Sequence, residues 1–397
     1  MRLSYLLISD ALMPRFTLLS LLAFLPATLL AQGRAEKAAF ITRLGSDTLS
    51  VEQFSRTSSR LESDVAARVP RARRLHFVVA LNPDHTVSRL QVTVQPAVPA
   101  PDAPAFTGDM VFGKDTVTMT IKQTDSTITL HVPAGAGAMP LTSTSYALYE
   151  QMFLRFQKAG KDSLPFLIVP FGGNQATETS IVRRGADGAD YDFFGLPMHA
   201  KLDKQGRLLG LDGRESTSKV LVERVKSADV EKAYKDFAAR DASQGAMGQL
   251  SARDTVRATV GNAHLTIDYG RPHKRGREIF GTVVPWGQVW RTGANAATGF
   301  TTDADLVVGS QTIPKGSYTL WSLPAQNGSK LIINSQTGQW GTDYHADKDF
   351  ARLDMKTEAL AQPVEVFTIA IDPQGDRAGV LKLQWDRTQL SLPFTVQ

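Results

Sequence analysis

The segment Ala263-His-Leu-Thr-Ile-Asp-Tyr269 carries the clearest structural signal in the chain. Its odd-numbered positions from 265 to 269 are apolar and its even-numbered positions from 264 to 268 are polar, which is typical of a strand with one buried face. Similar alternation recurs at residues 318–323, 330–334, 364–371, 380–385 and 390–396. Short strands at this frequency, with almost no helical periodicity, predict a β-sandwich over residues 251–397.

The region before residue 227 is also predicted to be rich in strands. Its alternating segments, separated by turn clusters, lie at residues 75–81, 86–95, 116–122 and 127–132. A helix interrupts them, with four aromatic residues spaced to share one face: Tyr146, Tyr149, Phe153 and Phe156. The predicted fold class is therefore mainly β, with an N-terminal antiparallel β-meander domain and a covering helix, then a C-terminal β-sandwich.

A second helix and a polar linker are expected between these regions. The helix is predicted over residues 228–239, and Ser227 can cap its first turn. Residues 240–249 are small and polar without periodicity, which is typical of a linker. The predicted organisation is a signal peptide at residues 1–31, an N-terminal antiparallel β domain at 32–226, a helix and linker at 227–250, and the sandwich at 251–397.

The first residues have the pattern of an export signal. Arg2 and Arg15 are basic, residues 16–30 form an uncharged apolar run, and Ala27 and Ala31 are small residues near a cleavage point. The run of 15 residues is shorter than the roughly 20 that cross a bilayer as a helix, so we expect removal of the signal and no membrane span afterwards. Translation from Met13 is an alternative start. The expected location is periplasmic or secreted.

Composition narrows the possible chemistry. The chain has 397 residues, no cysteine and a formal net charge of +5. The lack of cysteine excludes disulfides and thiol chemistry, and a charge surplus this small does not indicate nucleic acid as a partner. The seven histidines form no helical pair, and no nucleophile elbow occurs, so no catalytic residue, metal or cofactor is predicted.

Residues 269–298, called here the Arg/Trp segment, concentrate charged and aromatic side chains. Between Arg271 and Arg291 there are five basic residues and one acidic residue, whereas residues 251–397 carry 15 basic and 14 acidic residues in total. Guanidinium groups bind carboxylates or phosphates, and indoles stack on sugars or on Arg planes. The candidate ligand-binding residues are Tyr269, Arg271, Arg277, Trp286, Trp290, Arg291, Asn295 and Thr298.

An internal role for the same residues is the alternative. A long irregular segment needs internal hydrogen bonds to hold its shape, and Asn and Gly are typical of tight turns. Glu365 shares a strand face with Phe367 and is expected to be buried, where a carboxylate needs a partner. We hypothesise that Arg277 or Arg291 bonds Glu365.

The Arg/Trp segment also supports a family resemblance. The elements that carry it occur in one order: Tyr269-Gly-Arg-Pro272, Ile279-Phe-Gly281, Trp290-Arg-Thr-Gly-Ala-Asn-Ala-Ala-Thr298, Ile313-Pro-Lys-Gly-Ser-Tyr-Thr-Leu320 and Gln339-Trp-Gly-Thr-Asp-Tyr344. On these, residues 251–396 resemble the bacterial domain-of-unknown-function family 2911. The resemblance implies an exported bacterial protein with a β-rich domain and no established activity. Trp286 departs from the expected Tyr, and residues 32–250 resemble no family.

Three functions remain open on this basis. The first is a non-catalytic envelope protein that binds a polar or anionic small molecule, a glycan or an envelope protein at the Arg/Trp segment. The second is an envelope hydrolase with dispersed acid and base groups, such as Asp268, Glu278, Glu365 or His345. The third is a carrier of an apolar ligand in the N-terminal domain, around Phe166, Leu167, Phe193 and Phe194.

Overall fold

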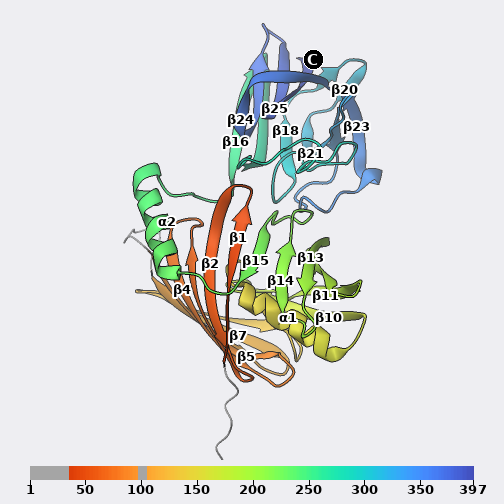
Figure 1. The fold of residues 1–397 in the computed structure, drawn as a ribbon. Helices are drawn as coiled ribbons and strands as arrows, with labels where there is room; N and C mark the ends of the chain where they lie inside the picture. The colour runs from red at the N-terminus through yellow and green to blue at the C-terminus, as the bar shows by residue number, and fades with distance from the viewer. Residues whose placement is uncertain (1–34, 97–104) are drawn as a thin grey trace, which may run out of the picture. The chain divides into compact units, whose positions relative to one another are not determined.

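The N-terminal part of the chain folds into one 15-stranded sheet in the computed structural model, which describes residues 35–96 and 105–397. Its strands are β1 (Glu36–Leu44), β2 (Asp47–Arg56), β3 (Arg60–Ala67), β4 (Arg73–Leu81), β5 (Val87–Pro96), β6 (Phe106–Phe112), β7 (Thr116–Lys122), β8 (Thr127–Pro133), β9 (Met139–Leu141), β10 (Ser163–Pro170), β11 (Thr177–Arg184), β12 (Gly188–Phe193), β13 (Leu196–Leu202), β14 (Leu208–Asp212) and β15 (Leu221–Val225). The chain runs outward from β1 to β8, restarts at the other edge with β9, and returns inward until β15 pairs with β1 (Figure 1). Neighbouring strands are antiparallel, apart from the parallel pair β9 and β10, so the predicted meander is confirmed.

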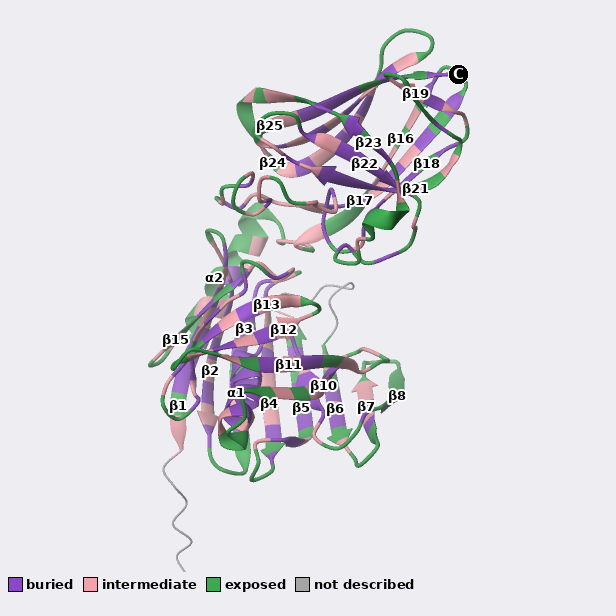
Figure 2. Cartoon of the chain, turned by 90° about the vertical axis from the view of Figure 1, so that its right-hand side faces the viewer, coloured by how far each residue is buried: buried purple, intermediate pink, exposed green. Residues whose placement is uncertain are grey.

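Period-two alternation explains how this sheet buries its core. In β5, Leu90, Val92 and Val94 are buried, whereas the residues between them are exposed. Successive side chains of a strand point to opposite faces, so one face packs inward while the other meets water. Figure 2 shows the same change between buried and less buried positions along neighbouring strands.

Helix α1 (Tyr146–Ala159) lies against this sheet in both views (Figures 1 and 2). Its aromatic stripe is buried as predicted, and Glu150 and Gln151 on another face are buried too. A helix that only covered a sheet would leave its polar face in water. The helix is therefore enclosed on more sides than the aromatic stripe alone indicated.

Two buried carboxylates fix α1 in place. Glu150 forms ion pairs with Arg56 and Arg224. Glu52, on β2, accepts hydrogen bonds from Ser145 Oγ at 2.6 Å and from the backbone N–H of Tyr146 at 2.7 Å, at the start of the helix. Burial raises the pKa of the Glu52 carboxyl, and these hydrogen bonds oppose that rise.

Residues from 251 onward form two packed sheets, as expected for a β-sandwich. The six-stranded sheet has the order β16-β17-β18-β21-β22-β23 and the four-stranded sheet has the order β20-β19-β25-β24. Their bounds are β16 (Ser251–Val260), β17 (Ala263–Pro272), β18 (Thr298–Thr302), β19 (Leu306–Val308), β20 (Gln311–Ile313), β21 (Gly316–Leu323), β22 (Lys330–Asn334), β23 (Asp349–Asp354), β24 (Lys356–Pro373) and β25 (Ala378–Val396), with a short 3₁₀ helix η1 (Ala346–Lys348). Ile267 of one sheet and Phe367 and Leu383 of the other share a buried core, so the predicted sandwich is confirmed.

Helix α2 (Val230–Gln244) differs from its prediction at both ends. Its N-cap is Asp229, which accepts from the backbone N–H of Lys232 at 2.8 Å, and not Ser227. It also continues through residues 240–244, which were expected in the linker. Ala and Arg in that stretch have high helix propensity, and this outweighed the lack of apolar periodicity.

The described residues, 35–96 and 105–397, belong to one compact unit, and the domain boundaries given above stay a prediction. The predicted export signal lies outside the described residues. Within the described part of the chain, the helices are all too short or too polar to cross a bilayer.

Candidate functional site

The loop of the Arg/Trp segment between β17 and β18 is an ordered part of the sandwich. Backbone bridges at four points tie it to itself or to neighbouring strands: His273 with Val366, Phe280 with Val284, Trp290 with Ser322, and Ala296 with Trp340. Because these points are spread along the loop, they fix its path and the direction of its side chains.

Four of the eight candidate residues have contacts within the sandwich and line no described cavity. Tyr269 is 1% exposed, and its hydroxyl accepts a backbone N–H of β24 at 3.0 Å. Arg271 donates to a carboxylate of β16 at 2.9 Å and to a carbonyl of β24. Trp286 stacks on Phe280 with ring centroids 5.6 Å apart, and the Thr298 hydroxyl donates to a backbone carbonyl in the same loop at 2.8 Å. These contacts give the four residues an internal role.

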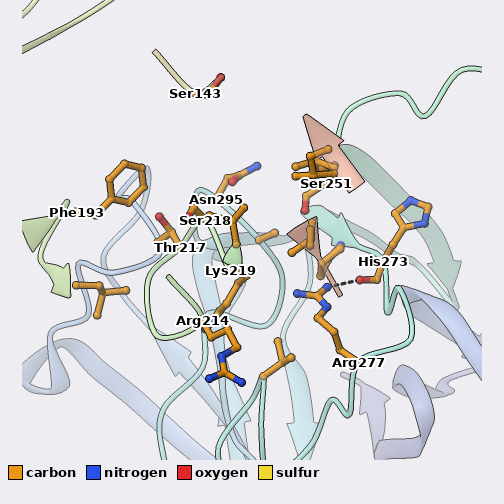
Figure 3. Close-up of a pocket in the computed structure, with 18 of the residues that line it drawn as sticks. Ser143, Phe193, Arg214, Thr217, Ser218, Lys219, Ser251, His273, Arg277 and Asn295 are labelled. Carbon is orange, nitrogen blue, oxygen red and sulfur yellow. Dashed lines mark hydrogen bonds between the residues drawn. The ribbon is translucent and has the colours of Figure 1, made fainter. Parts of the chain in front are cut away.

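The other four candidates, Arg277, Trp290, Arg291 and Asn295, line one cavity of about 1080 Å³. Figure 3 labels Arg277 and Asn295 among its lining residues. Lys219, which precedes β15, lines the same cavity and was not singled out from the sequence. The structure therefore brings half of the candidates together, and ligand binding by them stays a prediction.

The hypothesis that Arg277 or Arg291 bonds Glu365 is wrong. Glu365 is exposed, and its carboxylate accepts the backbone N–H of Arg275 at 2.8 Å. The register of β24 against β25 shifts between Val364 and Thr368, which breaks the strict alternation on which the expected burial rested.

Arg291 has no acidic partner among the described residues, and its Nε is buried without a hydrogen bond. Its side chain runs across Gly341, where a Cβ would lie 2.0 Å from the Arg291 Cδ, so a glycine is needed for this path. Burial lowers the pKa of Arg291. Arg291 is half-buried as a residue. A guanidinium that loses water without gaining a counter-charge is costly, because nothing replaces the lost hydration.

Lys219 and Arg277 add to this positive charge. Burial, with Arg291 and Arg277 nearby, lowers the pKa of Lys219 to about 8. Arg277 donates from Nε to the carbonyl of Lys274 at 2.9 Å and from a terminal nitrogen to the carbonyl of His273, as drawn in Figure 3. Carbonyls orient this guanidinium, and its charge forms no ion pair among the described residues, although the Glu365 carboxylate acts on it from a longer range. We call Lys219, Arg277 and Arg291 the cation cluster.

The backbone around the cluster is held in the left-handed region. Lys219, Thr292 and Asn295 have φ values of 57°, 52° and 64°. This conformation is uncommon for side chains other than Gly and Asn, and for a β-branched Thr it is costly. Lys219 and Thr292 therefore have strained backbone beside the cavity, whereas Asn295 adopts a turn conformation that asparagine favours.

Another wall of the cavity comes from the N-terminal part of the chain. It carries polar and charged side chains, such as Arg73 and Arg214, and a group of apolar or aromatic side chains. Its members of this kind are Leu44, Leu49, Ala67, Val69, Pro70, Tyr146, Tyr149, Phe193, Leu196, Pro197, Met198 and Val220. Of the residues named for an apolar carrier, Phe193 lies in this wall. Phe166 and Leu167 border a separate hollow of about 520 Å³.

Acidic groups are scarce around the cavity. Glu215 is the single carboxylate in its described lining, and it pairs with His199 at 3.3 Å. The dispersed acid and base candidates for a hydrolase do not line it: Asp268, Glu278, Glu365 and His345. Among described residues, no group of three His, Asp or Glu side chains is placed to hold a metal ion.

Comparison with known proteins supports the family resemblance for the C-terminal part. Residues 251–394 match the model of the family described as "Protein of unknown function (DUF2911)". A search of curated proteins finds no match.

Two solved structures are similar to part of this chain. A DUF1089 family protein of Pseudomonas aeruginosa is 13% identical over 42% of this chain and 90% of its own, with a TM-score of 0.31. A β-barrel-like protein of the domain of unknown function DUF1849 from Brucella abortus is 10% identical over 49% of this chain and 98% of its own, with a TM-score of 0.32. Scores this low carry no information on function.

Proposed function

We propose that this protein is a non-catalytic binding protein that takes an anionic ligand at the cation cluster, and that it acts after export to the cell envelope. The observation that carries the proposal is the Arg291 side chain, whose Nε is buried at the cavity without a hydrogen bond. An anion in the cavity supplies the counter-charge that the described residues around Arg291 lack.

Binding fits the lining better than hydrolysis does. Glycoside hydrolysis needs two carboxyl groups, about 5 to 10 Å apart, on either side of the scissile bond. The described lining offers Glu215 alone against Arg73, Arg214, Lys219, Arg277 and Arg291. A lining with that excess of cations favours an anionic ligand over general acid and base chemistry.

The proposal of export rests on the pattern of residues 1–31 described above. Fractionation of the bacterial cell, with an antibody against the chain, tests it. Recovery of a shortened chain in the periplasm or the medium supports export, and recovery of the uncleaved chain in the cytoplasm contradicts it.

Arg291→Met tests the binding site, with Arg257→Met as the matched control. Both changes remove one positive charge, but Arg257 is exposed on β16 and does not line the cavity. We expect inorganic phosphate and phosphorylated sugars to raise the melting temperature of the parent and of the control. Loss of one charge-assisted hydrogen bond predicts roughly ten- to hundredfold weaker binding by Arg291→Met.

Equal binding by the two variants would show that Arg291 takes no part in ligand recognition. Calorimetric titration of each variant in the same buffer decides between these results, and the melting temperature without ligand shows whether each variant is folded.

A further inference from the structure

We propose that the ligand is an amphiphile with one anionic head group and an apolar chain, with its head at the cation cluster and its chain against the wall formed by the N-terminal sheet and α1. This inference rests on the proposed function, because it specifies the chemistry of a ligand at the same cavity.

The first argument is the size of the cavity. Its volume is about 1080 Å³, slightly above the roughly 300 to 1,000 Å³ that is usual for small-molecule sites in proteins. One water molecule occupies about 30 Å³ in the liquid, so a phosphate or carboxylate alone displaces few waters. An anion small enough to satisfy the cation cluster therefore leaves most of the volume to the rest of the ligand.

The second argument is the nature of the remaining surface. Leu44, Leu49 and Met198 reach the cavity from the sheet, and Tyr146 reaches it from α1. These four side chains also belong to the hydrophobic core of the N-terminal sheet, so this wall is continuous with the core. Apolar surface of this kind gains free energy when it loses water to an apolar group.

The third argument is the presence of both charge and apolar surface in one cavity. The cations Arg277 and Arg291 come from the Arg/Trp segment and Lys219 precedes β15. The N-terminal side adds the charged Arg73, Arg214 and Glu215 together with apolar side chains, mainly from β1, β2, β13 and α1. A glycan would need polar partners along its whole length, because each unpaired hydroxyl that loses water is costly. An amphiphile needs polar partners at its head and apolar contacts along its chain, and the cation cluster and the apolar side chains of this lining offer both.

Phe193 and Phe194 provide a matched pair for the test. Their rings lie 4.9 Å apart at the end of β12, but Phe193 lines the cavity and Phe194 is 39% exposed and does not line it. Phe193→Ala therefore removes apolar surface from the proposed chain site, and Phe194→Ala removes the same side chain next to it.

The experiment measures dissociation constants for octyl, decyl and dodecyl phosphate and for the matching fatty acids, each below its micelle concentration. Inorganic phosphate and glucose 1-phosphate are the ligands without a chain. We expect affinity to rise about fourfold for each added methylene until the chain fills the cavity. Phe193→Ala should weaken binding of dodecyl phosphate roughly tenfold, and Phe194→Ala should leave it unchanged.

Other outcomes overturn the proposal in distinguishable ways. If inorganic phosphate or glucose 1-phosphate binds as tightly as dodecyl phosphate, the proposed function stands and the amphiphile is wrong. If chain length matters but Arg291→Met binds dodecyl phosphate like the parent, the placement of the head group is wrong. If no compound of either series binds while the protein melts cooperatively, the proposed function fails together with the inference.

Discussion

Lys219 and Arg291 are two side chains whose surroundings depart from what their charge favours. Each lines the cavity, and neither has an ion pair among the described residues. Sequence alone could place Arg291 in a segment rich in cations, but it could not show which arginines form an ion pair with a carboxylate. Arg271 and Arg291 look alike in the sequence, and only the fold brings a carboxylate to Arg271.

The charge of Lys219 leads to a pH dependence of binding. Its pKa of about 8 means that the ammonium is charged below that pH and neutral above it. We expect the affinity for dodecanoate, which stays ionised from pH 6 upward, to fall as the pH rises through about 8. In Lys219→Met this fall in affinity should be absent. Titration calorimetry of both proteins at several pH values measures the dissociation constant of dodecanoate.

Lys226→Met is the control for that change, because Lys226 is exposed and does not line the cavity. It should retain the pH dependence of the parent. A Lys219→Met variant that keeps the same dependence would assign it to another group.

Trp290 illustrates a residue with two predicted roles. Its ring packs 4.9 Å from that of Phe367 and stacks 5.8 Å from that of Trp385, and it also lines the cavity. We expect Trp290→Ala to lower the free energy of unfolding by about 3 to 5 kcal/mol, as for other large aromatic residues in cores. Trp340→Ala should change it by less than about 0.5 kcal/mol, because that indole is 47% exposed.

Denaturant unfolding followed by fluorescence measures both variants. Similar losses for the two would remove Trp290 from the core. A stable Trp290→Ala variant that loses ligand would leave recognition as its main role.

Strands and turns were more predictable than the site. Alternation in β17 and the aromatic spacing in α1 come from local geometry, so both could be predicted from neighbouring residues. The pairing of β1 with β15 and the cap that Glu52 provides for α1 depend on residues far apart in the chain. No local pattern contains that information. The apolar wall of the cavity was missed for the same reason.

The loop that carries Arg291 depends on a close approach to β17. A Cβ at Gly270 would lie 2.2 Å from the carbonyl oxygen of Ala294, whereas a Cβ at Gly299 in the adjacent β18 would lie 3.9 Å from its nearest neighbour. We expect Gly270→Ala to displace the loop, to destabilise the fold by about 1 to 3 kcal/mol, and to weaken anion binding. Gly299→Ala should bind like the parent.

Melting temperatures and phosphate titrations of both glycine variants test this expectation. If Gly270→Ala binds and melts like Gly299→Ala, the loop adapts freely, and its backbone does not position Arg291.

Two large hydrophobic cores, beside two smaller clusters, lie in the described part of the chain, one in the N-terminal sheet and one in the sandwich. Phe77 and Phe153 belong to one core and Ile267 and Phe367 to the other, and no side chain belongs to both. Cores that share no side chain can unfold separately, so we expect two transitions in scanning calorimetry. A ligand at the cavity should raise both midpoints, because both parts line it, and at 100 times its dissociation constant it adds about 2.7 kcal/mol.

A single transition, with equal calorimetric and van't Hoff enthalpies, would show that the two cores unfold together. A ligand that raises one midpoint alone would show that it contacts one part alone.

The pairing of β1 with β15 also constrains the order in which the chain acquires its structure. Ala39 lies opposite Val225, so the first strand has one edge unpaired until almost the whole N-terminal sheet has been synthesised. During that interval its backbone N–H and C=O groups are open to strands of other nascent copies. We therefore expect the nascent chain to be most prone to aggregation before residue 225 has emerged.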